Sequence, residues 1–566
     1  MGILPAKMTS KSIFPFLALL LLCLSAQTQN TVGTLLNTED SYNGYTFFSP
    51  FSGNKAWLVD NCGNLVNVWD RGTRPGLSAY FLENGLLFRT YKVPPFGPFT
   101  SASNAGGIEL VDWDNNTVWA YEINTTNRLS HHDAVYMPNG NILILTWELV
   151  YEEDLIAWGR DPDEIAQEGY MWSERIQELE PVGTDDANVV WEWRIKDHYI
   201  QQYDPDKMFY GVISEHPELF DINLPELNSS NSNSTRDWNH FNAIDYNPEL
   251  DQILISVRNS DEIWIIDHST TTEEAASHEG GLYGKGGDIL YRWGNPSAYK
   301  RAPVSSQKLF GQHGVHWIRD GLTDAGKIMI FNNGNGRPGP DYSTTEIIVP
   351  SQDENGGYIV PETTPFGPTF TDWTYGDQPG ENHYSPYLSN SQRLPNGNTL
   401  INPGSTGVIF EIDAQRNKVW EYVIPLYGDT PATQGGNVSN NSTFRAYRYG
   451  PDYPGFDGVD LTAGSTIEFG EDMNGCMLAV ATEEVVAGEA GFAVHYRTAD
   501  RSLTIYHSEN LPMRVSLTDL RGRTVFTGKT IAENQPLYLP DLPKGIYIAH
   551  LSNGSRMIYT QKILIH

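Results

Sequence analysis

Histidine is the residue type of this chain whose placement most clearly suggests chemistry. Only 14 of the 566 residues are histidines, yet three segments each carry one at the head of a similar strand-and-turn pattern. An imidazole can act as a nucleophile, an acid, a base or a metal ligand. The recurrence therefore predicts that several imidazoles converge on one site. The segments read His131-His132-Asp133-Ala-Val-Tyr-Met-Pro-Asn-Gly, Asp237-Trp-Asn-His240-Phe-Asn242-Ala-Ile-Asp-Tyr and Gln312-His313-Gly-Val-His316-Trp-Ile-Arg.

Strand geometry indicates which of these side chains share a face. Residues two apart in an extended strand project to the same side, so His240 and Asn242 are expected to point together. The same rule pairs His131 with Asp133 and turns His132 to the opposite face, which slightly favours His131 as the residue at the site.

Two arginines are candidates for the same place. Arg258, in Leu254-Ile-Ser-Val-Arg258, ends the strand that follows the Asn242 strand and can approach it. Arg337, in Phe331-Asn-Asn-Gly-Asn-Gly-Arg337, has weaker support.

The donor types help to choose among the chemistries. A metal site built from His131, His240 and His313 would commonly add a carboxylate, which Asp133 can supply, or keep an open water position. A set of His, Asn and Arg fits an oxyanion better, because Asn and Arg donate hydrogen bonds. Sulfuryl transfer from an aryl ester has these needs: an attacking imidazole, donors for three oxygens and a proton donor for the leaving phenolate. We therefore expect an oxyanion site without a metal or cofactor.

Short β-strands must position these residues. Aromatic and β-branched runs alternate with Asn-Gly and Asp-Asn turns, and no long helical period stands out. A Trp phrase recurs, as in Asn67-Val-Trp69, and marks six candidate repeats of several strands each. The other occurrences are Thr117-Val-Trp119, Val189-Val-Trp191-Glu-Trp193, Glu262-Ile-Trp264, Leu290-Tyr-Arg-Trp293 and Lys418-Val-Trp420.

The expected fold class is all-β, with a β-propeller of six blades over residues 27–455. An array of β-sandwiches is the alternative, although sandwiches rarely repeat a Trp phrase on this scale. Residues 456–495 are expected to be a linker or transition region, because the Trp phrase ends and Gly, Pro and Asp become frequent around residues 449–464.

The first residues have the order of a secretory signal. Lys7 and Lys11 precede an apolar run from Ile13 to Leu24 and the small residues Ser25 and Ala26, which predicts a signal peptide over residues 1–26. The run is too short for a comfortable membrane span. Beyond it only Cys62 and Cys476 remain, and the sequence leaves open whether they pair.

The charge balance restricts the partners. Lys and Arg number 37 against 70 Asp and Glu, a formal net charge of −33, so the overall field repels nucleic acid. An anionic substrate must therefore meet a local positive pocket.

The C-terminal stretch differs in character, with alternating strands that predict a small β-sandwich over residues 496–566. Its phrases Thr518-Asp-Leu-Arg-Gly-Arg523 and Leu542-Pro-Lys-Gly-Ile-Tyr547 closely resemble the C-terminal sorting domain of the type IX secretion system of Bacteroidetes. That resemblance implies a bacterial protein carried across the outer membrane by this machinery and found secreted or on the cell surface. The alternative is a carbohydrate-binding or interaction module.

The histidine segments, with the strand that ends at Arg258, resemble the bacterial arylsulfate sulfotransferases that use a donor ester rather than a nucleotide sulfate. The likeness covers roughly residues 40–450. It implies a six-bladed propeller and a ping-pong reaction through a sulfohistidine, with a phenolic sulfate ester as donor and a phenol as acceptor.

Roles follow from the resemblance position by position. His313 is similar to the nucleophile of the family, with His316 as its competitor. His240 and Arg258 resemble the leaving-group and sulfate-binding residues, and Asn242 the substrate-binding amide. The first histidine of the family maps to His131 or His132.

Two other functions stay open at this point. An aryl sulfate hydrolase on the same scaffold would use water as the acceptor, and a secreted propeller without catalytic activity would bind a ligand through its loops. Propellers host many activities, so the fold alone does not decide.

Overall fold

The structure is a computed structural model that describes residues 30–225, 236–353, 356–470 and 476 of the chain, together with most of the strands that follow. The latter are residues 492–497, 501–507, 514–519, 523–529, 537–540, 542–543, 545–553 and 556–565. The expected signal peptide over residues 1–26 and the polar segment at 228–234 lie outside the described residues. Two compact units comprise residues 1–477 and 478–566.

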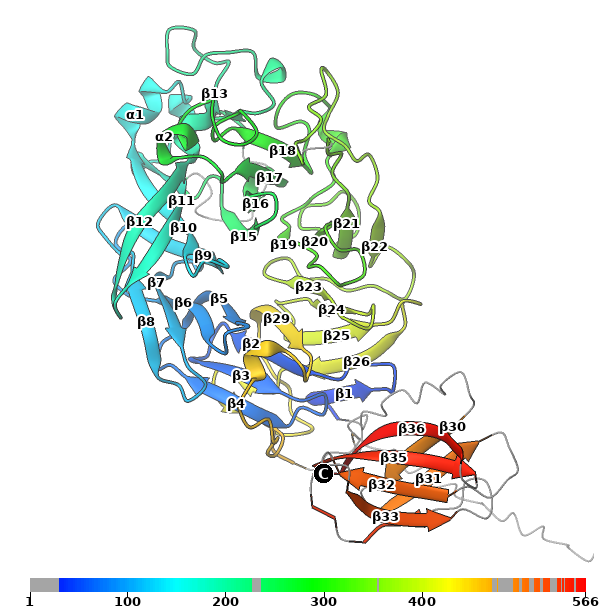
Figure 1. The fold of residues 1–566 in the computed structure, drawn as a ribbon. Coiled ribbons are helices and arrows are strands. Elements are labelled where there is room, and N and C mark those ends of the chain that lie inside the picture. The colour runs from blue at the N-terminus through cyan, green and yellow to red at the C-terminus, as the bar shows by residue number, and fades with distance from the viewer. Residues whose placement is uncertain are drawn as a thin grey trace, which may run out of the picture. The chain divides into compact units, whose positions relative to one another are not determined.

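The larger unit is a β-propeller whose described strands form six four-stranded blades around a central axis (Figure 1), as the sequence predicts. Blade 1 contains β2 (Tyr45–Pro50), β3 (Lys55–Val59) and β4 (Leu65–Asp70), with β29 (Thr443–Tyr449). Blade 2 contains β5 (Pro75–Phe81), β6 (Leu87–Lys92), β7 (Gly106–Val111) and β8 (Thr117–Glu122). Blade 3 contains β9 (Arg128–Tyr136), β10 (Ile142–Tyr151), β11 (Tyr170–Val182) and β12 (Asp186–Arg194).

The other three blades complete the ring. Blade 4 contains β15 (Phe241–Asn247), β16 (Gln252–Val257), β17 (Glu262–Asp267) and β18 (Ile289–Trp293). Blade 5 contains β19 (His313–Trp317), β20 (Ile328–Asn332), β21 (Thr344–Ile348) and β22 (Trp373–Tyr375). Blade 6 contains β23 (Asn390–Arg393), β24 (Thr399–Asn402), β25 (Val408–Ile412) and β26 (Lys418–Val423), and β1 (Gly33–Asn37) adds to its outer edge.

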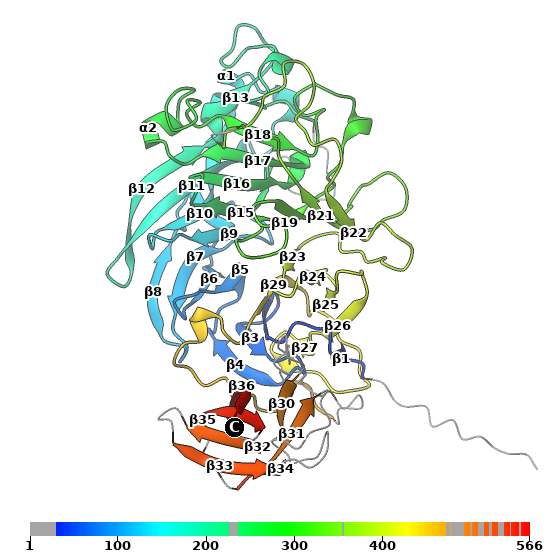
Figure 2. The same ribbon diagram turned by 45° about the vertical axis from the view of Figure 1, so that its right-hand side comes forward.

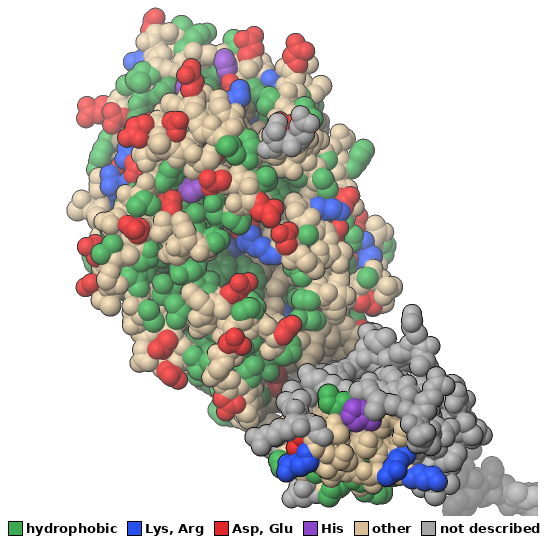
Figure 3. Space-filling view, in the orientation of Figure 1, with side chains coloured by type: hydrophobic (Ala, Val, Ile, Leu, Met, Phe, Trp, Pro, Cys, Tyr) green, Lys and Arg blue, Asp and Glu red, His purple; other side chains and the backbone are tan. Residues whose placement is uncertain are grey.

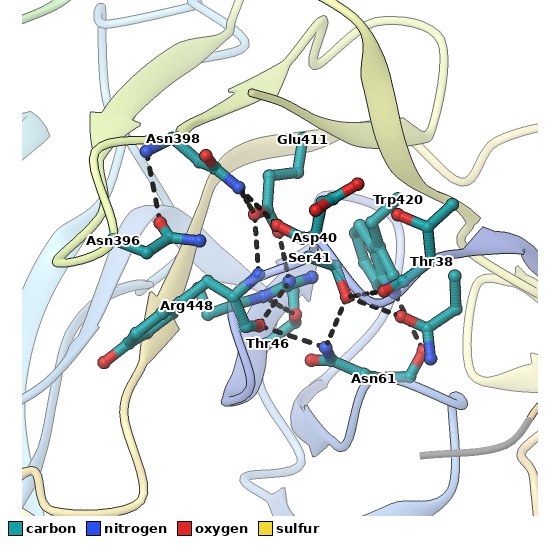
Figure 4. Close-up of polar contacts among 12 residues, drawn as sticks. Thr38, Asp40, Ser41, Thr46, Asn61, Asn396, Asn398, Glu411, Trp420 and Arg448 are labelled. Carbon is teal, nitrogen blue, oxygen red and sulfur yellow. Dashed lines mark hydrogen bonds and ion pairs between the residues drawn. The ribbon is translucent and has the colours of Figure 1, made fainter. Parts of the chain in front are cut away.

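The ring is closed by strands from both ends of the unit. β29 supplies the innermost strand of blade 1, next to β2 from the N-terminal side. A buried ion pair of 2.6 Å joins Arg448 on β29 to Glu411 on β25. Asn398 donates to Glu411 and to the Asp40 carbonyl, so the N-terminal segment joins the same network (Figure 4). These hydrogen bonds satisfy charges whose burial would otherwise be costly.

Tryptophans of the repeated phrase hold neighbouring blades together. Most lie on outermost strands, where the indole N–H donates to a backbone carbonyl of the next blade at 2.7–2.9 Å. A large ring fills the wedge between two blades while its polar edge stays bonded. The pairs are Trp69 with Asp112, Trp119 with Asp186, Trp193 with Gly287, Trp293 with Pro368 and Trp420 with Asn61.

The phrase does not correspond to one blade per occurrence. Trp264 lies on β17, the third strand of blade 4, whose outermost strand carries Trp293. In blade 5 the outermost strand β22 begins at Trp373, which lies outside the phrase. The count of six is right because one blade carries two occurrences and another carries none.

Minor elements lie at the rim of the propeller. Parallel β13 (Tyr199–Ile200) and β14 (Phe220–Asp221) form one short pair, and β27 (Leu426–Tyr427) and β28 (Thr430–Pro431) form another. The helices α1 (Glu152–Ala157) and α2 (Thr272–Ala275) are short. Among the residues that the structure describes, no helix is long and apolar enough to cross a membrane.

Residues 456–470 run along the propeller. Phe456 stacks on Phe81 with ring centroids 5.2 Å apart, and Thr466 pairs with Asn64. Cys476 forms a disulfide with Cys62, with 5.6 Å between the Cα atoms, which settles the pairing that the sequence leaves open.

The smaller unit is the expected β-sandwich, with the two sheets visible in Figure 2. Leu503, Val515, Leu517 and Leu551 are among the residues of its buried core. One sheet contains β30 (Phe492–Arg497), β31 (Ser502–His507) and β34 (Leu537–Tyr538); the other contains β33 (Thr524–Lys529), β32 (Arg514–Asp519), β35 (Gly545–Asn553) and β36 (Arg556–Ile565).

Candidate active site

The three histidine segments lie where the innermost strands of blades 3, 4 and 5 begin. Each contains a β-bulge, at residues 131–133, at Asn242 and between His313 and His316. A bulge re-aims side chains and is common beside active sites. His132 and His240 have positive φ angles of 47° and 56°, and Gly314 one of 61°. Positive φ is uncommon for a residue other than glycine and marks local strain.

His132 and His240 meet across the boundary between blades 3 and 4. Their Nε2 atoms are 3.1 Å apart, and both residues are buried. The other ring nitrogen of His240, Nδ1, lies 2.6 Å from Asp237 Oδ2, so it carries a proton that it donates to the carboxylate. Asp237 thus fixes the tautomer and the orientation of the His240 ring.

His131 lies behind this pair rather than within it. Its Nδ1 is 2.8 Å from His132 Nδ1, and its ring stacks on Trp147 with centroids 4.0 Å apart. Its Nε2 is 3.0 Å from the carboxylate of Glu174. Strand parity predicts that His131 rather than His132 faces the site. In the structure it is the His132 ring that faces His240, so this prediction is wrong. The reason is the positive φ of His132, which breaks the strand alternation.

His313 is held in a single tautomer by two acceptors. Its Nδ1 lies 2.9 Å from the Gly311 carbonyl and 2.8 Å from Asn333 Oδ1. The amide nitrogen of Asn333 donates to the Ser385 and Leu388 carbonyls, which orients its oxygen toward His313. Nδ1 must therefore carry the proton, and Nε2 keeps its lone pair. The backbone N–H of Leu388 donates a long hydrogen bond of 3.3 Å to that lone pair.

Arg258 supplies the positive charge of the site. It begins a 3-10 turn directly after β16, and its backbone N–H donates to the His240 carbonyl at 3.2 Å. Its guanidinium donates to Asn259 and forms no ion pair among the described residues. Burial lowers the pKa of Arg258, and the charges of Asp261 and Asp237 act in the opposite direction without contacting it as an ion pair. A buried guanidinium without a direct carboxylate partner suits an anionic ligand.

Two asparagine side chains near Arg258 have polar atoms without a hydrogen-bond partner. Asn242 donates to the Gln312 carbonyl at 2.8 Å, while its side-chain oxygen is buried without a hydrogen-bond partner. Both polar atoms of the Asn239 side chain are also buried and without a partner. Buried polar groups are usually hydrogen-bonded, so these atoms can take a polar partner such as water or a substrate oxygen or hydroxyl.

Burial and neighbouring charges shift the pKa values of these groups. Burial lowers the pKa of His313 well below its usual value, and the charge of Arg258 lowers it further. Burial has the same effect on the pKa of His132, with contributions from His240 and Arg258. Burial also lowers the pKa of His131, to about 3, and raises the pKa of Glu174 well above its usual value. Neutral imidazoles are the nucleophilic form.

Two of the sequence candidates lie elsewhere. His316 lines a cavity of about 540 Å³ with Tyr80, Arg319 and Arg445, further along the innermost strands. The propeller face in Figure 3 is hollowed near its centre, where hydrophobic and Lys or Arg side chains gather. None of the site histidines lines this cavity. Arg337 stacks on Tyr342 with its guanidinium 4.0 Å from the ring centroid.

The family comparison agrees with this geometry. A family model described as arylsulfotransferase (ASST) matches residues 116–425, which is more than half of the chain and includes every residue of the site. The chain belongs to the arylsulfotransferase family. A second model, described as a secretion system C-terminal sorting domain, matches residues 499–566. This arylsulfotransferase is therefore a secreted or cell-surface protein.

Other comparisons show only distant likenesses. No curated protein matches the arylsulfotransferase chain. Virginiamycin B lyase from Staphylococcus aureus is 11% identical over 70% of this chain and 88% of its own, with a TM-score of 0.28. The periplasmic gluconolactonase of Pseudomonas aeruginosa is 10% identical over 69% of this chain and 98% of its own, with a TM-score of 0.32. Likenesses this low carry no information about the reaction of the arylsulfotransferase.

Several residues of the site cannot be found by the histidine pattern alone. Asp237 stands three residues before His240, a spacing visible in the sequence. Glu174 on β11 and Asn333 after β20 are far from the histidines along the chain and are brought to them only by the stacking of strands. Leu388 contributes a backbone group, which no side-chain pattern reveals.

Proposed function

We propose that this arylsulfotransferase moves a sulfuryl group from a phenolic sulfate ester to a phenolic acceptor, with a sulfohistidine at His313 as the intermediate. The observation that carries this proposal is the tautomer of His313. Acceptors at Gly311 and Asn333 hold the proton on Nδ1 and leave Nε2 unprotonated, with one weak hydrogen bond of 3.3 Å from the Leu388 backbone N–H. A neutral buried imidazole with an unprotonated Nε2 can attack as a nucleophile once the donor ester takes the place of that weak contact.

In the first step Nε2 of His313 attacks the sulfur of the donor ester. The N–S bond forms as the bond between sulfur and the phenolic oxygen breaks, and the electron pair leaves on that oxygen. The Arg258 guanidinium and the unpartnered amide nitrogen of Asn239 are the donors that would bind the sulfuryl oxygens, whereas the unpartnered oxygen of Asn242 can only accept. Preorganised donors stabilise developing negative charge without reorganising.

The leaving phenolate needs a proton, which His240 is placed to deliver. Asp237 accepts from its Nδ1 at 2.6 Å, so a protonated His240 is stabilised, and its Nε2–H, which faces His132 Nε2 at 3.1 Å, must turn from His132 to the leaving oxygen to donate there. In the second step the phenolic acceptor loses its proton to His240, and its oxygen attacks sulfur. The N–S bond breaks, and the lone pair returns to His313.

The imidazoles next to His240 could carry the proton that His240 takes up or releases. Three hydrogen bonds link His131, His132, His240 and Asp237 in sequence. Glu174 Oε2 lies 3.0 Å from His131 Nε2, but neither atom has a hydrogen-bond partner, so this contact lacks hydrogen-bond geometry. The three imidazoles can therefore share one proton, and Glu174 would join the row only after its carboxyl turns toward His131.

The test compares transfer in matched variants. Full-length mature protein is incubated with 4-nitrophenyl sulfate, with and without phenol. We expect the release of nitrophenol to require the acceptor beyond the first turnover, and phenyl sulfate to form in equal amount. H313A should lose the activity. H316A removes the other histidine of the same strand, outside the site, and should retain it.

Two results would contradict the proposal. Transfer at the wild-type rate in H313A would exclude His313 as the nucleophile. Steady release of nitrophenol that is independent of phenol would identify a hydrolase.

A further inference from the structure

A second cluster of nitrogen and oxygen donors lies far from the catalytic histidines along the strands, at the outer joint of blades 3 and 4. His198 ends a 3-10 helix, Ile195–His198, that directly follows the outermost strand of blade 3. His278 and Asp288 flank the glycine-rich loop between α2 and the outermost strand of blade 4. Three segments thus bring two imidazoles and a carboxylate together.

The two imidazoles meet the same carboxylate oxygen. Nδ1 of His198 and Nδ1 of His278 each lie 2.8 Å from Oδ1 of Asp288. All three donor atoms lie within 4.8 Å of one another. His198 and Asp288 are buried, whereas the His278 side chain is 60% exposed and reaches the cluster from the solvent side.

The hydrogen bond of His198 Nε2 determines what can lie between the other ring nitrogen, Nδ1, and Asp288. Nε2 is 2.9 Å from the Ala275 carbonyl, which can only accept, so Nε2 carries a proton. In the neutral ring Nδ1 is then a lone pair, and it faces a carboxylate lone pair at 2.8 Å. Such a contact needs a cation between the two atoms, either a second proton or a metal ion. A backbone carbonyl on the distal N–H is the usual outer contact of a metal-binding histidine.

The surroundings hold His198 rigidly. Its ring is parallel to Trp193, with centroids 5.3 Å apart and 3° between the planes, and Trp193 donates to the Gly287 carbonyl. A Cβ on Gly287 would lie 2.7 Å from Nε2 of His198 and 2.1 Å from the Ala275 carbonyl. Only glycine permits the loop to approach this closely.

We propose that His198, His278 and Asp288 bind a divalent first-row transition ion, with Zn²⁺ as the best match. Two imidazoles and one carboxylate are typical zinc ligands and leave a fourth position for water. Bond lengths near 2.0–2.1 Å require the donor atoms to be roughly 3.3–3.4 Å apart. Both contacts of Asp288 Oδ1, with His198 and with His278, are 2.8 Å and must widen, the first by a small shift of the Asp288 carboxylate and the second by outward movement of the exposed His278. The ion would clamp the outer joint of the two blades whose inner strands carry His132 and His240.

The test uses full-length, tag-free protein stripped of metal with a chelator that is then removed. Zn²⁺ is titrated at pH 7.5 against a chromophoric competitor, and Co²⁺ is bound separately for its visible spectrum. We expect one equivalent of Zn²⁺ that stabilises the fold to heat. In H278A and in the isosteric D288N its affinity should fall at least about ten-fold, and the Co²⁺ bands of the site should disappear.

H216A is the matched control. His216 also contacts a carboxylate through Nδ1, at 2.9 Å from Glu218, but no second histidine of the described residues joins that pair. This variant should bind Zn²⁺ as the wild type does. If the wild type binds no Zn²⁺, or if H278A and D288N bind as many equivalents as tightly as H216A, the proposal is wrong. His198 would then be an imidazolium paired with Asp288.

Discussion

His132 and His240 face each other through their Nε2 atoms, 3.1 Å apart, from the innermost strands of two neighbouring blades. Only one proton can lie between them, so the state of one ring dictates the state of the other. Asp237 holds the far side of His240, and His131 with Glu174 holds the far side of His132. In the proposed reaction, the pair would couple the acid–base nitrogen of His240 to the buried imidazoles behind it.

Removing the charge of Asp237 should affect poor leaving groups most. D237N leaves His240 in place but no longer stabilises its protonated form, so proton donation weakens. With phenyl sulfate we expect a fall in kcat of roughly 10²–10³-fold, within the range of general acid catalysis. With 4-nitrophenyl sulfate, whose phenolate needs little help, the fall should be much smaller. A series of aryl sulfates measures this dependence, and an equal loss for all of them would argue against an acid role of His240.

Weakening the hydrogen bonds that keep the His313 proton on Nδ1 should slow the reaction without weakening substrate binding. N333L removes the only side-chain acceptor of the described residues that bonds to Nδ1 and leaves the Gly311 carbonyl as the single group that holds the proton there. We expect kcat to fall by about 10²-fold or more with little change in KM, because a misplaced imidazole proton is costly in triad enzymes as well. N390L is the control, since Asn390 is also buried and bridges strands through Ala446 but does not touch His313. Equal losses in both variants would point to a general effect on folding.

Arg258 should not tolerate lysine. R258K keeps a positive charge but loses the planar fork that can hold two sulfuryl oxygens at once. We expect kcat/KM for aryl sulfates to fall by roughly 10–100-fold, with a smaller loss than in R258L. Steady-state kinetics of both variants check this. Unchanged kinetics in R258L would remove Arg258 from the site.

A buried imidazolium between blades 3 and 4 should make stability depend on pH. Burial alone would lower the pKa of His268, but hydrogen bonds to Asp251 and Glu178 raise it to about 9. Because this value is above the unfolded pKa of about 6.5, the stabilisation is complete below that pH and is lost as the pH rises through about 9. The full effect is about 3 kcal/mol.

Thermal unfolding of wild type and H268Q tests this. The midpoint of H268Q should be lower at pH 6, and the difference should vanish above pH 9. H216Q, which alters an exposed histidine, should show no such convergence. A difference that is constant from pH 6 to pH 10 would contradict the ionic origin.

Fold and site differ in how far the sequence predicts them. The six blades and the C-terminal sandwich follow from alternation, turns and repeated phrases, because these patterns are local. Even there, Trp264 and Trp293 belong to one blade, a grouping that depends on how the strands pair. The histidine segments are visible in the same way, and Asn242 and Arg258 follow from their place on adjacent strands.

What the sequence does not predict depends on backbone angles and on packing between blades. Strand parity turns His132 away from the site, whereas a φ of 47° turns it toward His240. The acceptors that set the tautomer of His313 come from Gly311 and Asn333, and a bulge separates His313 from His316. These backbone angles and hydrogen-bond partners are set only when the strands pair within blades and the blades pack together.

The most direct test of the central claim is to identify the residue that becomes sulfated. Protein is mixed with excess 4-nitrophenyl sulfate without acceptor, quenched at a pH that preserves N–S bonds, digested and mapped by mass spectrometry. We expect one sulfuryl group on the peptide that contains His313, and fragmentation should assign the group to that residue. The group should be lost when phenol is added before the quench. A sulfuryl group on His240, His132 or His316, or no covalent label during active turnover, would contradict the central claim.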